Sequence, residues 1–138
     1  MIQSGQASLS VRSSETEPDV VSRLLNLEPT DITYKGTVRR SGRTVEHHVW
    51  HLDTDELANT SDDRAGTRAL RALLELTRPA IGRVAKLPPD CEARIWWSAS
   101  SDSVQGGFVL AADLAAEIAS LGVDVVGTVY LEDRNPPH

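Results

Sequence analysis

Apolar and polar positions repeat along the chain with two different periods, which predict helices and strands respectively. The helical period is clearest between Asp62 and Arg78, where apolar residues fall on one side at about 100° per residue. That apolar side comprises Ala65, Ala69, Leu70, Leu73 and Leu76. The opposite side carries an arginine stripe, which comprises Arg64, Arg68, Arg71, Glu75 and Arg78. A helix with two such sides packs its apolar side against another element, and the neighbouring segments predict strands that can supply that surface.

The other periodic segments give the order of the elements. Alternation at every second residue predicts strands over residues 7–12, 32–38, 44–52, 94–100, 105–110 and 123–131. Helical spacing predicts one helix that starts near Thr16 and ends at Glu28-Pro29, and another around Leu114 to Leu121 with Gly122 behind it. The resulting order, βαββαββαβ, predicts an α+β fold, in which a mainly antiparallel sheet has helices packed on one face.

Single residues refine this outline. Thr16 stands three residues before Asp19, with Pro18 between them, which predicts a capping box at the first helix. Ser41-Gly42 predicts the tip of a hairpin. Pro79 is expected to split the 62–78 helix from a short second piece.

The strand at 44–52 places His48, Trp50 and Leu52 on one face, and His47 and His51 on the other. Trp96 and Trp97 likewise point to opposite faces of their strand. One tryptophan is expected in the core. The other is either shielded by a loop or exposed as an interaction anchor.

Size and composition are those of one domain. The chain has 138 residues, of which 40% are hydrophobic and 25% are charged. We expect a single domain over residues 1–138, with a core from about residue 7 to 131 and flexible ends at residues 1–6 and 132–138. Cys91 is the lone cysteine, which suits a reducing compartment. The sequence has no apolar run of about 18 residues and no secretory signal, so a cytoplasmic protein without a membrane span is expected.

Charge argues against most nucleic-acid binders. The formal net charge is −6, and phosphate affinity requires a concentrated basic surface. Lysines and arginines are nevertheless concentrated in the segments 35–51 and 64–86. Nucleic-acid binding is therefore unlikely from the sequence, and the arginine stripe with Arg39, Arg40 and Arg43 is the only route to it.

The sequence does not predict reactive chemistry. His47 and His51 share a strand face but stand roughly 13 Å apart, which is too far to bind one ion together. The residues Gly106-Gly107 lack the further glycine and lysine of a phosphate-binding loop. We therefore predict no catalytic residue, no cofactor and no metal ligand.

Five short motifs, taken in order, are similar to those of an uncharacterised bacterial family, the domain of unknown function 4279. They are Leu27-Glu28-Pro29-Thr30, Lys35-Gly36, Val49-Trp50-His51-Leu52, Gly106-Gly107-Phe108-Val109-Leu110 and Leu121-Gly122-Val123-Asp124-Val125. The resemblance covers residues 7–131. It implies the α+β architecture and a prokaryotic cytoplasmic origin, and it implies no activity.

The sequence alone does not identify the function, and a small binding protein is its best interpretation. A protein partner is the leading hypothesis, which includes an immunity-like role and self-association as a homodimer. A second hypothesis is a small-ligand module or enzyme with a pocket near Lys35, His48, Trp50 and Trp97, and a third is weak nucleic-acid binding through the arginine stripe. The candidate interaction residues are Lys35, Arg39, Arg40, His48, Trp50, Arg64, Arg68, Arg71 and Trp97.

Overall fold

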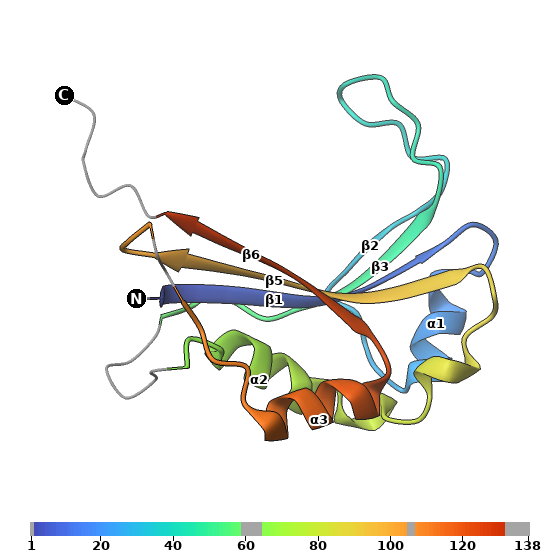
Figure 1. Cartoon of the computed structure of the whole chain (residues 1–138). Coiled ribbons are helices and arrows are strands. Elements are labelled where there is room, and N and C mark those ends of the chain that lie inside the picture. Colours follow the sequence, from blue (N-terminus) through green and yellow to red (C-terminus); the bar gives the residue numbers. More distant parts are fainter. Residues whose placement is uncertain (1, 59–64, 105–106, 132–138) are drawn as a thin grey trace.

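The computed structural model describes residues 2–58, 65–104 and 107–131 (Figure 1). Its strands and α-helices, in chain order, are β1 (Ile2–Ser13), α1 (Pro18–Leu25), β2 (Asp31–Thr33), β3 (His48–Asp53), β4 (Leu57–Ala58), α2 (Arg68–Leu76), β5 (Cys91–Ser101), α3 (Ala112–Leu121) and β6 (Asp124–Leu131). Two short 3₁₀ helices, η1 (Arg78–Ala80) and η2 (Val84–Lys86), connect α2 to β5.

The strands form one sheet around β1. The order across it is β2-β3-β1-β5-β6, and β4 pairs with the beginning of β1. All neighbouring strands are antiparallel except β5 and β6, which are parallel. A parallel pair requires a crossover connection, and α3 provides it.

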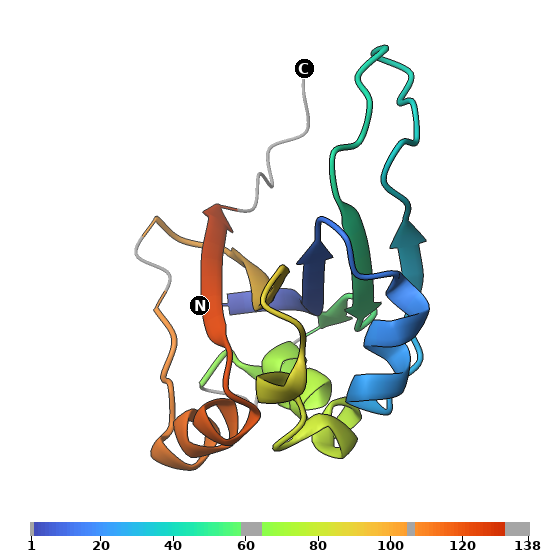
Figure 2. The same ribbon diagram turned by 90° about the vertical axis from the view of Figure 1, so that its right-hand side faces the viewer.

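The three α-helices lie on the same face of the sheet (Figure 1). Figure 2 shows the other face without a helix over it, with β6 rising on one side and the hairpin between β2 and β3 on the other. The prediction of an α+β fold with a mainly antiparallel sheet and helices on one face is therefore confirmed.

The core lies between this helix layer and the sheet. Every second residue of the long strands points into it, as Leu9, Trp50 and Ile95 do, each at most 1% exposed. The helices contribute Val21 and Leu73, which are equally buried. Alternation along the strands thus predicted correctly which of these residues share a face.

The first strand is longer than predicted. Residues 2–6, expected to be a flexible end, belong to β1, and the side chain of Ile2 is buried. This stretch is polar in sequence, but it is ordered by backbone pairing with β5 and β4, which side-chain alternation does not detect. The other expected flexible end, residues 132–138, lies outside the described residues.

The amphipathic helix is shorter than predicted. It begins at Arg68 instead of Asp62, and Gly66 just before it has a φ of +76°, which no helix residue adopts. At its other end Leu76 is exposed, whereas Leu74 is buried. As predicted, the chain near Pro79 leaves the α-helix and continues as the 3₁₀ helices η1 and η2.

The predicted strand at 105–110 is wrong for the part that the structure describes. Residues 107–110 form no strand and lead from the end of β5 down to α3. Phe108 packs edge-to-face against Trp97, with ring centroids 4.8 Å apart, and the Val109 N–H donates to the Ala65 carbonyl. These contacts hold the segment as a crossover, so the order βαββαββαβ is wrong at this point.

The predicted capping box at Thr16 is also wrong. Residue Glu17 occupies the N-cap position of α1 and makes no side-chain cap bond. The Thr16 hydroxyl instead donates to Asp90, as do the N–H groups of Thr16 and Glu15. Asp90 thereby ties the loop before α1 to the loop before β5.

The hairpin after β2 leaves the sheet early. The strand β2 has three residues and β3 begins at His48, so residues 34–47 form a protruding hairpin arm. Hydrogen bonds between Gly36 and Val45 and between Arg39 and Arg43 hold the arm together. Gly42 at its tip has a φ of +84°, as expected for the predicted turn.

Candidate interaction surface

The sheet face opposite the helices is the largest surface without a covering layer, and we call it the free face. Strand register and alternation assign residues to it. The free face comprises Ser4, Gln6, Ser8, Ser10 and Arg12 of β1; Val49, His51 and Asp53 of β3; Glu92, Arg94, Trp96, Ser98 and Ser100 of β5; and Asp124, Val126, Thr128 and Tyr130 of β6.

Two aromatic side chains stand out from the small polar residues of the free face. Trp96 is 46% exposed and Tyr130 is 59% exposed. Across the sheet, Trp96 lies between Ser8 of β1 and Val126 of β6. A large aromatic residue with small neighbours leaves both its ring face and its edge open to contact.

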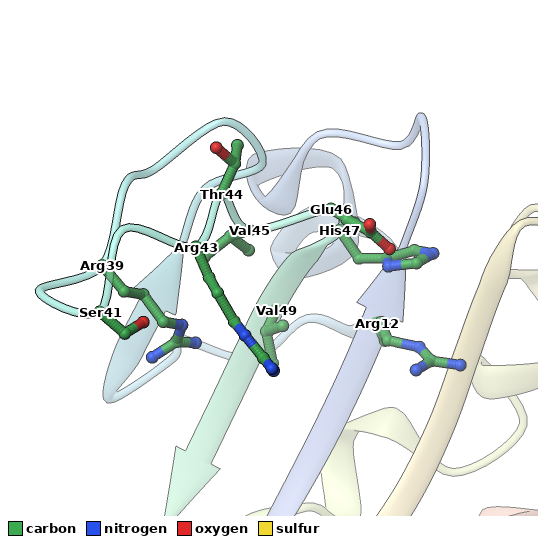
Figure 3. A pocket seen from close by; sticks show the side chains of 9 residues that line it. All are labelled: Arg12, Arg39, Ser41, Arg43, Thr44, Val45, Glu46, His47 and Val49. Atoms are coloured by element: carbon green, nitrogen blue, oxygen red, sulfur yellow. The ribbon is translucent and has the colours of Figure 1, made fainter.

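The hairpin arm encloses one end of the free face and forms a basic hollow there (Figure 3). The hollow is lined by Arg12, Arg39, Ser41, Arg43, Thr44, Val45, Glu46, His47 and Val49. In Figure 3 the side chains of Arg39 and Arg43 reach from the arm toward the sheet, whereas Arg12 extends from β1 toward β5, where it pairs with Glu92. A second hollow shares Arg12 and Val49 with the first and extends to Trp96. The two hollows are adjacent, and we call them together the depression.

The arginines of this depression differ in how they are paired. Arg12 and Arg94 both contact the carboxylate of Glu92, so one carboxylate is shared by two guanidinium groups. Arg39 and Arg43 have no acidic partner among the residues that the structure describes, and both are exposed. Two unpaired guanidinium groups therefore face the basic hollow and are available to an anionic group.

Lys35 and His48, both predicted as interaction residues, brace the base of the hairpin arm. The Lys35 ammonium donates to the Ser14 carbonyl at 3.1 Å and lies 3.4 Å from a carboxylate oxygen of Glu15. The Lys35 N–H donates to Nδ1 of the buried His48. These two side chains hold the arm to the loop before α1, which is a structural task.

Trp50 and Trp97, also predicted, are buried. Trp50 is 1% exposed and donates its indole N–H to the Ser22 hydroxyl, while Trp97 is 4% exposed. Their strand partners on β1 are Val11 and Ala7, which lie roughly 13 Å apart. The predicted pocket near Lys35, His48, Trp50 and Trp97 is therefore wrong, because the four residues do not converge.

The arginine stripe is engaged within the molecule. Arg68 donates to the Ala58 carbonyl at 2.6 Å, and Arg71 forms a two-point contact with Asp113 of α3 at 3.1 and 3.3 Å. Arg78 is 3.6 Å from Glu75 on its own helix turn. Arg64 lies outside the described residues. Arg68 and Arg71 thus tie α2 to neighbouring elements, and the use of the stripe as a binding surface stays a prediction. Arg40 is exposed at the tip of the hairpin arm.

Two further observations concern metal ligands and the single cysteine. No group of three histidine, cysteine, aspartate or glutamate residues among them is arranged to hold a metal ion. Burial raises the pKa of the Cys91 thiol, which keeps it in the less reactive protonated form. None of the helices in the described part combines the length and apolar character needed to span a membrane.

Three residues of the site were missed or misplaced in the sequence analysis. Trp96, and not Trp97, is the exposed tryptophan. Tyr130 was not named, and Arg43 was named only for the nucleic-acid hypothesis. A signal for Trp96 was present, because it has the same parity as the charged Glu92 and Arg94 on its strand, and charged residues face water.

Comparison with known proteins identifies the chain at the level of a family. No characterised protein and no solved structure matches it significantly. One family model does match and covers residues 3–132, which confirms the resemblance described above. The chain therefore belongs to the family described as Domain of unknown function (DUF4279).

Proposed function

We propose that this protein binds a partner protein through the free face and the hairpin arm. The observation that carries the proposal is an exposed Trp96 in a depression that ends at the unpaired Arg39 and Arg43. Tryptophan, tyrosine and arginine are the residues that most often dominate binding energy at protein interfaces. A bacterial cytoplasmic location and an immunity-like role are the settings in which we place this binding.

The charges of the site indicate the chemistry of the partner. Arg39 and Arg43 favour a partner segment with carboxylate side chains, because guanidinium groups bind carboxylates in a two-point geometry. Trp96 favours an apolar or aromatic side chain next to that acidic segment. The partner surface therefore combines acidic residues with an apolar anchor.

A single-stranded nucleic acid is a less favourable occupant. Exposed aromatic residues and arginines on an open sheet also suit stacked bases. The same face, however, carries Asp53 and Glu92, and the whole chain has a net charge of −6, which opposes a polyphosphate backbone. These acidic residues are why we favour a protein.

Site-specific photo-crosslinking in cells of the source organism tests the proposal. A photoreactive phenylalanine analogue replaces Trp96 in one variant and Leu76 in a matched control, since Leu76 is equally exposed on the helix side. We expect a discrete protein adduct from position 96 only, identified by mass spectrometry. The adduct should be lost when Arg39→Glu and Arg43→Glu are added.

Purified components complete the test. Binding of the identified protein to the wild type should weaken by tenfold or more with Trp96→Ala, and it should weaken with added salt. The same adducts from both positions would contradict the proposal. An adduct that nuclease treatment removes would also contradict it and would assign the face to nucleic acid.

A further inference from the structure

The outer edge of β6 is open to pairing with another strand. It pairs with β5 on one side, and no described strand pairs with it on the other. The opposite edge of the sheet is β2, which has three residues, one of them the charged Asp31. β6 has eight residues, so the two edges differ greatly in their capacity to pair.

The sequence of β6 carries little of the usual protection of an edge strand, because its one charged residue, Asp124, stands at its first position. From Val125 to Leu131 it contains neither a charged residue nor a proline. Natural edge strands normally place such residues where they prevent unwanted pairing. Their absence over seven consecutive residues marks this edge as a pairing surface.

Apolar side chains on the helix side of β6 add to the open edge. A cleft between β6, α3 and residues 107–110 has Trp97 at its inner wall. Phe108, Leu110 and Val129 line it and are 47%, 49% and 36% exposed. Figure 2 shows α3 directly below β6 at this side of the molecule. The cleft and the strand edge therefore form one continuous apolar surface.

We propose that β6 pairs antiparallel with β6 of a second copy of this chain, which joins two sheets into one. A two-fold axis at Thr128 places Val126 opposite Tyr130 of the partner on the free face. On the helix side it places Val125 opposite Leu131, and Gly127 opposite Val129. Each of these three pairs is apolar or small, and the one charged residue of β6, Asp124, lies outside them at the first position of the strand. A second copy suits this edge because the strand is complementary to itself.

Gly127 supports this arrangement. A Cβ atom at that position would lie 3.1 Å from the Trp97 ring, so glycine lets the ring approach the strand backbone. It also leaves the helix side of β6 without a side chain at the centre of the edge. The partner's Val129 then fills the space beside it and covers part of the cleft.

The mass of the protein in solution tests this proposal. Sedimentation analysis over the micromolar range should show a species of twice the 15.0 kDa chain mass. Thr128→Lys places two like charges opposite each other at the axis and should weaken the dimer by at least about tenfold. Thr33→Lys makes the same change on the β2 edge and should leave the dimer unchanged.

A crosslinking experiment keeps the test independent of folding defects in the lysine variant. In a Cys91→Ser background, Thr128→Cys should form an intermolecular disulfide under mild oxidation, because residues opposite each other in a strand pair bring their Cβ atoms close enough. Thr33→Cys is the matched control and should stay monomeric. A wild type that is monomeric at all concentrations would overturn the proposal. A dimer that resists Thr128→Lys, without a disulfide at position 128, would overturn it as well.

Discussion

Leu73 and Leu76 give the sharpest test of how α2 packs. The sequence placed both on the apolar side of the helix, whereas the structure buries Leu73 completely and leaves Leu76 49% exposed. Truncation of a fully buried leucine to alanine removes favourable apolar burial and leaves a cavity, which typically costs about 3–5 kcal/mol. Because α2 packs on the central strand β1, the surrounding residues can move little to fill the cavity. We therefore expect Leu73→Ala to lower the free energy of unfolding by about 3 kcal/mol or more.

Leu76→Ala is the control for the same substitution on the same helix. This substitution removes a half-exposed side chain and introduces a better helix former. We therefore expect the free energy of unfolding to change by no more than about 0.5 kcal/mol. Urea unfolding followed by circular dichroism measures the free energy of unfolding of both variants. In each case the slope of this free energy against urea concentration should equal that of the wild type, which indicates an intact two-state transition. Equal losses for the two variants would refute the packing described here, because they would place Leu76 in the core.

Three further predictions concern single contacts. The Thr16 hydroxyl and two backbone N–H groups lower the pKa of Asp90 from 3.8 to about 2. The contribution of Asp90 to the free energy of unfolding is therefore complete above pH 4 and is lost as the pH falls toward 2. Asp90→Asn should lower the urea midpoint at pH 7 and flatten the dependence of stability on acidic pH. Gly127→Ala should destabilise the fold by about 1 kcal/mol or more and change the near-UV circular dichroism, because its Cβ would crowd Trp97. Arg71→Ala, which breaks an exposed ion pair with Asp113, should cost less than about 1 kcal/mol in thermal unfolding, and added salt should shrink the difference.

Strand alternation was the most reliable guide in the sequence. It assigned Trp50 and His48 to one face and His51 to the other, and the structure agrees. Gly122 ends α3 in the left-handed conformation, as its position predicted. Both predictions depend on local geometry alone, because side-chain direction in a strand and the φ angle of a helix cap are set by the nearest residues.

Predictions that depend on distant contacts were less successful. Residues 108–110 are three consecutive apolar residues, a pattern that fits a strand and a crossover segment equally well. The packing of Phe108 on Trp97, which the sequence does not show, holds them in the crossover. The arginine stripe was expected to face water or a partner, but the sequence did not show that Arg71 pairs with Asp113, which lies 42 residues further along the chain. Alternation also separates Trp96 from Trp97 without saying which of them faces the helices. That choice is made by the whole helix layer.

The two proposed surfaces share one face of the sheet, and their positions make them related. Trp96 lies on β5, one strand inward from the β6 edge. Pairing across a two-fold axis at Thr128 would place two copies of Trp96 three strand spacings apart across the sheet, or roughly 14 Å in that direction. The two free faces would then form a single surface with a basic hairpin arm at each end. A symmetric partner could contact both halves at once, and such a partner gains affinity from the second contact without any new residue. In this proposal the open edge would double the surface that the free face presents to a partner.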